Sequence, residues 1–262
     1  MHHTPQRLAD SLGSDGPWLF LSPHLDDAIL SCGALMAAQA GRRRLTVATM
    51  CTEAGPPPHT RSARAFMRMA DAADAADLFA ERRREDLAAL RGLGIGAVHF
   101  GATDAIYRRR TPSPLGRLAG RLLPELVHLY PTYRFHMVAG RVARGDRDLA
   151  ERVRSRVSEL LAHTGADLLF CPLAEGRHAD HVLARSIGAA FQDRVVYYSD
   201  FPYNQASEPD ASFIRSHRLE SWRWDVGLDT KERAIRSYKT QADALFPQGT
   251  IPRVPEMYFA AP

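Results

Sequence analysis

The fold is decided by residues 17–33, which read PWLFLSPHLDDAILSCG. The apolar run WLFL predicts a short buried strand. The segment AILSCGALMAAQA, which begins inside this stretch, has the apolar spacing of a helix. His24, Asp26 and Asp27 lie between the two, and all three are groups that bind metals or transfer protons. The stretch therefore predicts a strand, a chemically active turn and a helix.

The rest of the chain repeats this alternation of apolar strands and helices. Further strands are predicted at 44–52, 97–101, 166–173 and 194–202, an edge strand at 217–227, and helices at 61–91, 116–128, 148–165, 181–191 and 229–245. Strands that are apolar throughout and separated by helices indicate a parallel sheet covered on both faces. We expect one α/β domain over residues 1–262, with 1–16 as a loose polar extension. Residues 130–146 fit no pattern.

The composition is that of a soluble globular protein, since 45% of the 262 residues are hydrophobic and 24% are charged. The net charge of +4 is too small and too evenly spread to indicate a nucleic acid partner. Only two of the 34 basic residues are lysines, a bias that a GC-rich bacterial coding sequence explains. The arginine runs at 42–44, 82–84 and 108–110 fit solvated faces.

The cysteines and the N-terminal residues indicate a cytoplasmic protein. Cys32, Cys51 and Cys171 show no CxxC spacing and lie in or beside apolar runs, as is typical of buried free thiols in a reducing compartment. The N-terminus lacks the apolar core of a signal peptide. No apolar stretch approaches the ~20 residues of a membrane span. The oligomeric state stays open.

A second polar motif, His178-Ala179-Asp180-His181, follows the predicted strand at 166–173. In doubly wound sheets, ligands bind outside the carboxyl ends of the strands, so the two motifs converge if their strands are neighbours. Two histidines and a carboxylate with an open position describe a hydrolytic zinc site, although this donor set also suits ferrous iron. A carboxylate that does not bind the metal can accept a proton from water, and a further histidine can stabilise an oxyanion.

Each motif alone also fits a helix cap with a surface histidine. The presence of both in one α/β chain, each after an apolar strand, favours the metal site. No GxGxxG follows the first strand, so a dinucleotide is not expected.

The motifs resemble those of the LmbE-like family of metal-dependent deacetylases, which includes the PIG-L-type N-acetylglucosaminyl-phosphatidylinositol de-N-acetylases. The family's Pro-His-Pro-Asp-Asp is matched by residues 23–27, with Leu25 in place of the second proline, and its His-x-Asp-His by residues 178–181. Weaker marks are Arg82 with Glu85 before a Leu-Gly, an Asp after the third strand, the segment VYYSDFP, and a final helix with Lys231 and YKTQ. The resemblance spans residues 17–242.

The resemblance implies a Rossmann-like, mostly parallel sheet with helices on both faces and a metal at the carboxyl ends of its strands. His24, Asp27 and His181 would bind the metal. Asp26 would be the general base that takes a proton from water and passes it to the leaving amine. The implied roles of the remaining two residues are that His178 stabilises the oxyanion and Asp180 orients a neighbouring histidine.

Three more residues are candidates for contact with the substrate. Arg82 is three residues from Glu85 on one helix face, so a structural ion pair explains it equally well. Asp104, implied by the resemblance to lie at the substrate rim, also fits a turn. Arg108 could contact a phosphate or carboxylate of the substrate.

The expected function is hydrolysis of an N-acetyl or related N-acyl group on an N-acetylglucosamine-type amino sugar, with Zn²⁺ or Fe²⁺ as the metal. Within the family, the substrate would be a sugar precursor of a thiol or an intermediate of bacterial secondary metabolism. An amidase acting on a non-sugar or thiol-conjugate amide, a phosphoester hydrolase using the same metal, and a non-catalytic sugar-binding module are the alternatives.

Overall fold

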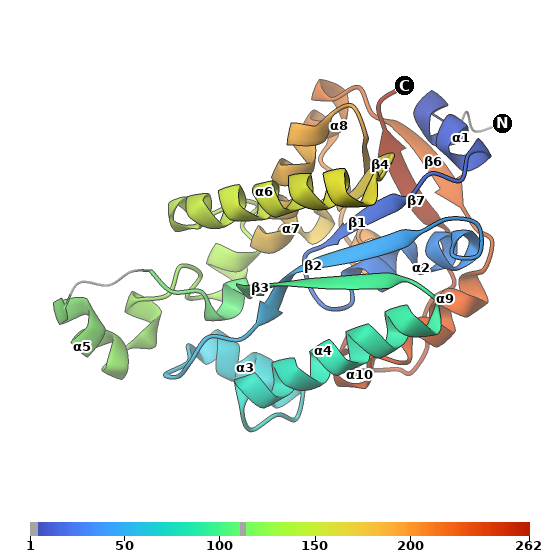
Figure 1. Ribbon diagram of the computed structural model, residues 1–262. Helices are drawn as coiled ribbons and strands as arrows, with labels where there is room; N and C mark the ends of the chain where they lie inside the picture. Colours follow the sequence, from blue (N-terminus) through green and yellow to red (C-terminus); the bar gives the residue numbers. More distant parts are fainter. Residues whose placement is uncertain (1–4, 111–113) are drawn as a thin grey trace.

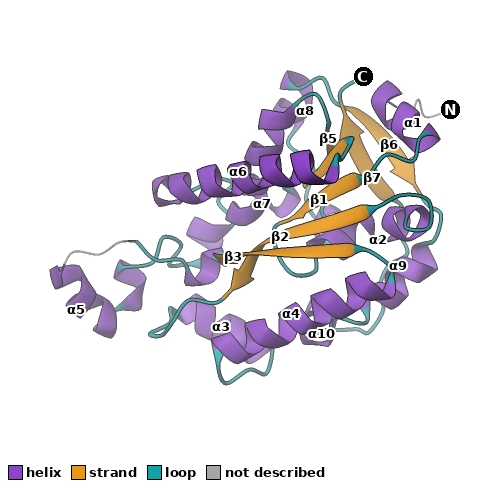
Figure 2. Ribbon diagram, in the orientation of Figure 1, coloured by secondary structure: helices purple, strands orange, loops and turns teal. Residues whose placement is uncertain are grey.

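A seven-stranded sheet forms the centre of the protein in the computed structural model, which describes residues 5–110 and 114–262 (Figure 2). The strand order is β3-β2-β1-β4-β5-β7-β6, and the first five strands of this order are mutually parallel. β7 is antiparallel to both of its neighbours. The strands are β1 (Trp18–Ser22), β2 (Leu45–Glu53), β3 (Gly96–Thr103), β4 (Leu168–Pro172), β5 (Val195–Tyr198), β6 (Glu220–Trp224) and β7 (Glu256–Ala260).

Helices cover both faces of this sheet (Figure 1). The longer ones are α2 (Asp27–Gln39), α4 (Ala75–Gly92), α6 (Arg147–Thr164) and α7 (Ala179–Gly188). The shorter ones are α1 (Gln6–Gly13), α3 (Arg61–Met69), α5 (Pro114–Leu122), α8 (Ala211–Ser216), α9 (Leu228–Ile235) and α10 (Lys239–Leu245).

The central strand β1 shows why the sheet needs both layers. Trp18 and Phe20 pack into a core formed with α2, α4, α9 and α10, whereas Leu19 and Leu21 pack into a second core formed with α6 and α7. Successive side chains of a strand point to opposite faces, so an entirely apolar strand must be buried on both sides. The predicted α/β architecture is therefore confirmed.

The order in which the chain adds strands to the sheet reverses at β1, and this reversal creates the site. β1 pairs in parallel with β2 on one side and with β4 on the other. The chain thus winds outward from β1 to β3 and then returns to continue from β4 on the opposite side. A crevice forms at such a switch point outside the carboxyl ends of the strands. The two polar motifs follow β1 and β4, so their predicted convergence is confirmed.

The structure corrects several of the expected elements. Residues 6–13 of the supposedly loose extension form α1, which buries Leu8, while residues 1–4 lie outside the described residues. The helix expected at 61–91 is two helices, because Asp71 has a positive φ of 49° and Asp74 caps a new helix at Ala75. The helix expected at 229–245 is likewise two, α9 and α10.

Two regions were not anticipated from the sequence. Strand β7 was not predicted, and it inserts between β5 and the edge strand β6. Residues 130–146 contain a five-residue π-helix, Tyr133–Met137, and a short 3₁₀ turn. Among the described residues, no helix has the length and apolar character needed to cross a membrane.

Candidate metal centre and active site

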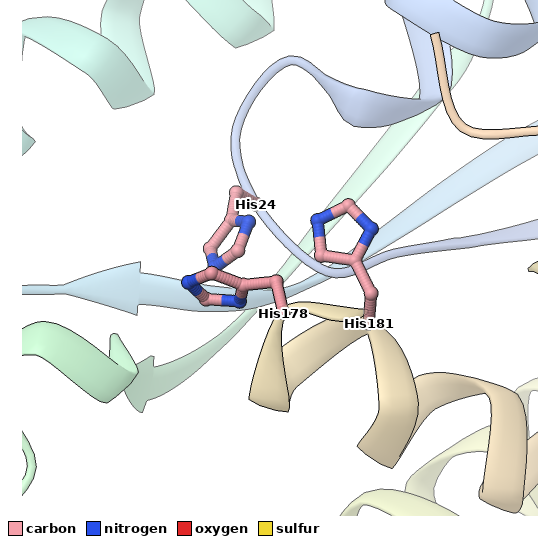
Figure 3. Close-up of side chains that lie close together, drawn as sticks. All are labelled: His24, His178 and His181. Carbon is pink, nitrogen blue, oxygen red and sulfur yellow. The ribbon is translucent and has the colours of Figure 1, made fainter. Parts of the chain in front are cut away.

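Three histidines from the two motifs lie together at the carboxyl ends of β1 and β4 (Figure 3). The ring centroid of His24 is 4.9 Å from that of His178 and 5.3 Å from that of His181. His24 lies in the turn after β1, whereas His178 caps the N-terminus of α7 and His181 lies in its first turn. Residues that are more than 150 positions apart in the sequence thus share one site.

His24 is held by a carboxylate on each side of its ring. Its Nε2 lies 3.2 Å from Asp180 Oδ2, and its Nδ1 lies 3.1 Å from Asp27 Oδ2. The Asp27 oxygen also accepts the backbone N–H of His24 at 2.9 Å. Burial lowers the pKa of His24, but Asp104, Asp180 and Asp27 outweigh it and raise that pKa well above its usual value. The surroundings of His24 therefore favour a positive charge.

Asp180 is fully buried and faces away from solvent. One of its carboxylate oxygens accepts the backbone N–H of Ala105 at 3.0 Å as well as bonding to His24, and the other is paired with Arg108. Burial raises the pKa of Asp180, but Arg108 and His24 outweigh it and hold that pKa well below its usual range. Asp180 is therefore an ionised carboxylate placed to orient the His24 ring.

His181 is oriented in the same way by Asp200. Its Nδ1 lies 2.5 Å from Asp200 Oδ1, and its Nε2 lies 3.2 Å from Asp27 Oδ2. Among the described residues, no group makes a hydrogen bond to that buried Nε2. Burial lowers the pKa of His181, but Asp27 and Asp200 raise it to about 10.

The side chains of His24, Asp27 and His181 lie close enough together to bind one cation. One oxygen of Asp27 lies within 3.2 Å of a ring nitrogen of each histidine. Burial raises the pKa of Asp27, but His181 and His24 outweigh it and hold that pKa well below its usual range. An ionised carboxylate, two oriented imidazoles and an otherwise unpartnered buried nitrogen fit a divalent cation that accepts nitrogen and oxygen ligands. Ligand atoms of His24, His178 and His181 also lie within 4.8 Å of one another, so His178 is a second candidate ligand beside Asp27.

The ring of His178 is a neutral hydrogen-bond donor. Its Nδ1 accepts the backbone N–H of Asp180 at 3.3 Å, which assigns the proton of the neutral ring to Nε2. Burial and the charge of His24 hold the pKa of His178 well below its usual value. The side chain also lines the cavity, so its N–H can donate to a developing negative charge.

Asp26 lies next to Asp27 but in a different electrostatic environment. Burial and the negative charge of Asp27 raise the pKa of Asp26 to about 7, against the opposing charge of Arg82, whose Nη2 is 4.0 Å from Oδ1. Arg82 also donates to the side chain of Gln241, which in turn donates to the Leu25 carbonyl at 3.0 Å. This chain of contacts fixes the turn that carries Asp26.

A cavity of about 220 Å³ opens above these groups. The predicted site residues that line it are His24, Asp26, Asp27, Arg82, Asp104 and His178. The side chains of Asp180 and His181 are almost completely buried and are not part of this lining.

Arg108 is placed differently from the sequence-based expectation. It is buried, its guanidinium pairs with Asp180 and lies 2.8 Å from Asp146, and it does not line the cavity. Asp180 and Asp146 raise the pKa of Arg108 further above its usual value, although burial opposes them. In this geometry Arg108 supports the orienting carboxylate Asp180 and does not reach into the cavity.

Sequence reasoning missed the structural roles of three residues of the site. Asp200 follows β5 at the same edge of the sheet, and its position directly after an apolar strand was a signal for it. Gln241 occurs in the final helical motif but had no assigned role. The ring of Tyr203 packs edge-on against His181 with centroids 5.7 Å apart, a contact between distant segments that the sequence did not predict.

Comparisons with known proteins found similar sequences and similar folds. A sequence model of the PIG-L family, described as GlcNAc-PI de-N-acetylase, matches residues 19–191. The 2'-N-acetylparomamine deacetylase of Streptomyces fradiae is 30% identical over 200 residues, which are 75% of this chain but only 60% of that relative. The match therefore spans less than two thirds of the relative's length.

Solved structures show the same fold. A zinc-inhibited form of the teicoplanin deacetylase superposes with a TM-score of 0.71 at 24% identity, covering 93% of this chain and 97% of that one. The deacetylase of the A40926 pseudoaglycone gives a TM-score of 0.65 at 22% identity, with 94% and 97% covered. At these identities the likeness concerns the fold alone.

Proposed function

Because the chain belongs to the PIG-L family of de-N-acetylases, we propose that it is a metal-dependent hydrolase that removes an N-acetyl or related N-acyl group from an N-acetylglucosamine-type amino sugar. The observation that carries this proposal is the convergence of the two motifs around the unpartnered Nε2 of His181. A hydrolytic metal can activate water, a carboxylate of raised pKa can accept its proton, and a neutral imidazole can donate to the oxyanion, which together suffice for amide hydrolysis.

His24, Asp27 and His181 are the proposed ligands. A divalent cation bound there would lower the pKa of water and polarise the carbonyl of the scissile amide. Asp180 and Asp200 fix the ring orientations of the two ligand histidines through their other nitrogens.

Asp26 and His178 carry out the remaining steps in this proposal. The carboxylate of Asp26 lines the cavity, accepts a proton from the attacking water, and returns that proton to the leaving nitrogen. The Nε2–H of His178 donates to the carbonyl oxygen as it becomes negative. The products are a carboxylate and a free amine.

We propose zinc as the metal, because nitrogen and carboxylate ligands with no thiolate in the proposed set are typical of catalytic zinc, although they also suit ferrous iron. The test is metal analysis of the purified protein followed by chelation and reloading with each metal. Amine release that returns with zinc supports the proposal. Full activity after complete chelation would refute it.

The proposed substrates are small molecules of secondary metabolism, in keeping with the names of the relatives. The test measures amine release from a panel of N-acetylglucosaminides, including paromamine-type and glycopeptide conjugates. Release of amine and acetate in equal amounts supports deacetylation. Release of phosphate instead, from phosphorylated members of the panel, would assign the site to phosphoester hydrolysis.

A further inference from the structure

We propose that the substrate presents an apolar group next to its reacting amide, and that this group binds to an apolar wall formed by α3 and α10. The apolar wall consists of Phe66 and Met69 of α3, the following Ala70, and Ala244 and Leu245 of α10. It faces the same cavity as His24 and Asp26, so this inference rests on the proposed function of that site. The inference goes beyond that function because it states that the part of the substrate next to the scissile amide is apolar.

The polar side chains near the apolar wall are already engaged with one another. The carbonyl oxygen of Gln241 accepts from Arg82, and its amide donates to the Leu25 carbonyl. The hydroxyl of Thr240 donates to Glu85 at 2.6 Å. A sugar hydroxyl that approached this side would compete with buried hydrogen bonds, which is costly. Recognition on this side of the cavity therefore relies on apolar contact.

One large side chain of the wall, Met69, is exposed to solvent. Met69 is 68% exposed, and it is the last residue of α3 at the rim of the cavity. Because Met69 adjoins the other apolar residues of the wall, it adds to the apolar surface that a ligand can remove from water. Methionine is also flexible enough to adapt to ligands of different shape.

The size of the cavity indicates that the substrate extends onto this rim. Its volume of about 220 Å³ lies below the ~300–1,000 Å³ of sites that enclose a drug-sized ligand. An acylated sugar alone would fill this volume, so a larger substrate has to extend onto the surrounding surface, of which Met69 is one exposed part. An alkyl or aryl group at that point would bury both itself and the wall.

The test compares kcat/KM of the metal-loaded enzyme for N-acetylglucosamine with that for hexyl and phenyl β-N-acetylglucosaminides and for N-hexanoylglucosamine. The glycosides place the apolar group on the anomeric carbon, and the last compound places it on the acyl side. We expect at least one placement to raise kcat/KM by about 10-fold or more, in line with the effect of added methylenes in apolar pockets.

The gain should depend on the wall. Met69→Ser should remove most of it while leaving kcat/KM for N-acetylglucosamine within a factor of about two. Val226→Ser is the matched control, because Val226 is 59% exposed but does not line the cavity. Leu245→Ser provides a second variant on α10. A gain that neither wall variant reduces, or no gain in either arm, would overturn the inference.

A binding measurement separates this inference from the proposed function. Hexyl β-glucosaminide carries no amide, so its calorimetric binding does not depend on turnover. We expect it to bind more tightly than glucosamine, with a negative heat-capacity change, and expect Met69→Ser to weaken that binding. If such binding is found but no amide is hydrolysed, the apolar wall is supported as a binding surface and the deacetylase proposal is refuted. If amides are hydrolysed but the hexyl group increases neither affinity nor rate, the deacetylase proposal is supported and the inference about the apolar wall is refuted.

Discussion

Asp26 and Asp27 are adjacent in the sequence, yet their environments push their pKa values in opposite directions. Asp27 lies between two imidazoles that favour its charge, whereas Asp26 is buried beside the negative charge of Asp27. Where the environments of two neighbouring titratable groups push their pKa values apart, the two groups have different roles. The group of lowered pKa stays ionised and can bind a cation, and the group of raised pKa can exchange a proton. At the residue scale, this contrast supports Asp27 as a ligand and Asp26 as the base.

Replacing Asp26 should therefore affect rate more than metal binding. We expect Asp26→Asn to retain the metal and to lose about 10²–10⁴-fold in kcat, because the amide cannot accept the proton of water. Metal analysis and steady-state kinetics on one preparation check both parts. Asp243→Asn, on α10 outside the cavity lining, serves as the control. A rate unchanged from the parent enzyme would exclude Asp26 as the base.

The raised pKa of Asp26 predicts the acid side of the pH profile. A general base works only when it is deprotonated, so kcat/KM should rise with pH and level off above the pKa. Burial and Asp27 bring that pKa to about 7, and the charge of a bound cation shifts it lower. We expect an inflection at or below pH 7 in the profile of kcat/KM. A profile that is flat from pH 5 to 8 would contradict this assignment.

Asp200 should control metal affinity, because it orients His181 from behind. Its Oδ1 is 2.5 Å from Nδ1, and the amide of Asp200→Asn can present a donor where an acceptor is needed. We expect metal affinity to fall by about 10–100-fold, measured by competition with a chelating dye. Asp193→Asn, at an exposed position two residues before β5, should leave the affinity unchanged.

At the scale of elements, the turn before α7 depends on a glycine. Gly176 has a φ of +74°, and a Cβ there would lie 3.0 Å from the ring of Tyr203. That ring packs against His181, so the turn, the tyrosine and the metal site are coupled. The loop before α7 therefore has little freedom to change in sequence or shape.

Gly176→Ala should destabilise the protein by about 1–3 kcal/mol, because it combines a strained backbone with a clash. Denaturant unfolding measures the effect. Gly92→Ala is the matched control: Gly92 ends α4 with a φ outside the positive range and, among the described atoms, nothing within 4 Å of the added Cβ. The control should be neutral or slightly stabilising. Equal effects of both changes would argue against the proposed coupling.

A buried ion pair joins β7 to α2 and α9. Glu256 of β7 accepts the backbone N–H groups of Ala34 and Leu35, each at 2.9 Å, and lies 3.2 Å from Lys231 Nζ. Removal of one partner leaves an uncompensated buried charge. We expect Lys231→Met to lower the free energy of unfolding by about 3–5 kcal/mol. Arg233→Met, which breaks the exposed pair with Asp229, should change it little.

At the scale of the whole molecule, the sequence predicted the parts of the fold that follow simple periodic patterns. The apolar runs of β1 and β4 and the polar motifs after them were sufficient to predict a parallel sheet with converging ends. The same logic failed for β7, whose alternating buried and half-buried residues form a short strand near several prolines. Its pairing with β5 and β6 is non-local, so no short pattern encodes it.

For the site, too, the sequence predicted what local patterns encode and missed what depends on contacts between distant residues. The two motifs supplied the candidate residues, and the resemblance that they carry implied which of them bind the metal, act as base or orient a histidine. Asp200 and Arg108 could not be placed in this way, because Asp200 reaches His181 across 19 residues and Arg108 reaches Asp180 across 72. The expectation that Arg108 contacts the substrate overlooked two acidic partners that only the fold brings near.

The contact between Gln241 and the turn at Leu25 spans 216 residues and has a consequence for the order of events during synthesis. His24 leaves the ribosome long before the side chain of Gln241 that secures its turn and before the strand β7 that packs against α2. Contacts this distant form slowly, because the intervening chain must first be ordered. A nascent chain that stops short of Gln241 would carry both histidine motifs and still lack a finished site. The site is thus completed only after Gln241 and β7 have been synthesised.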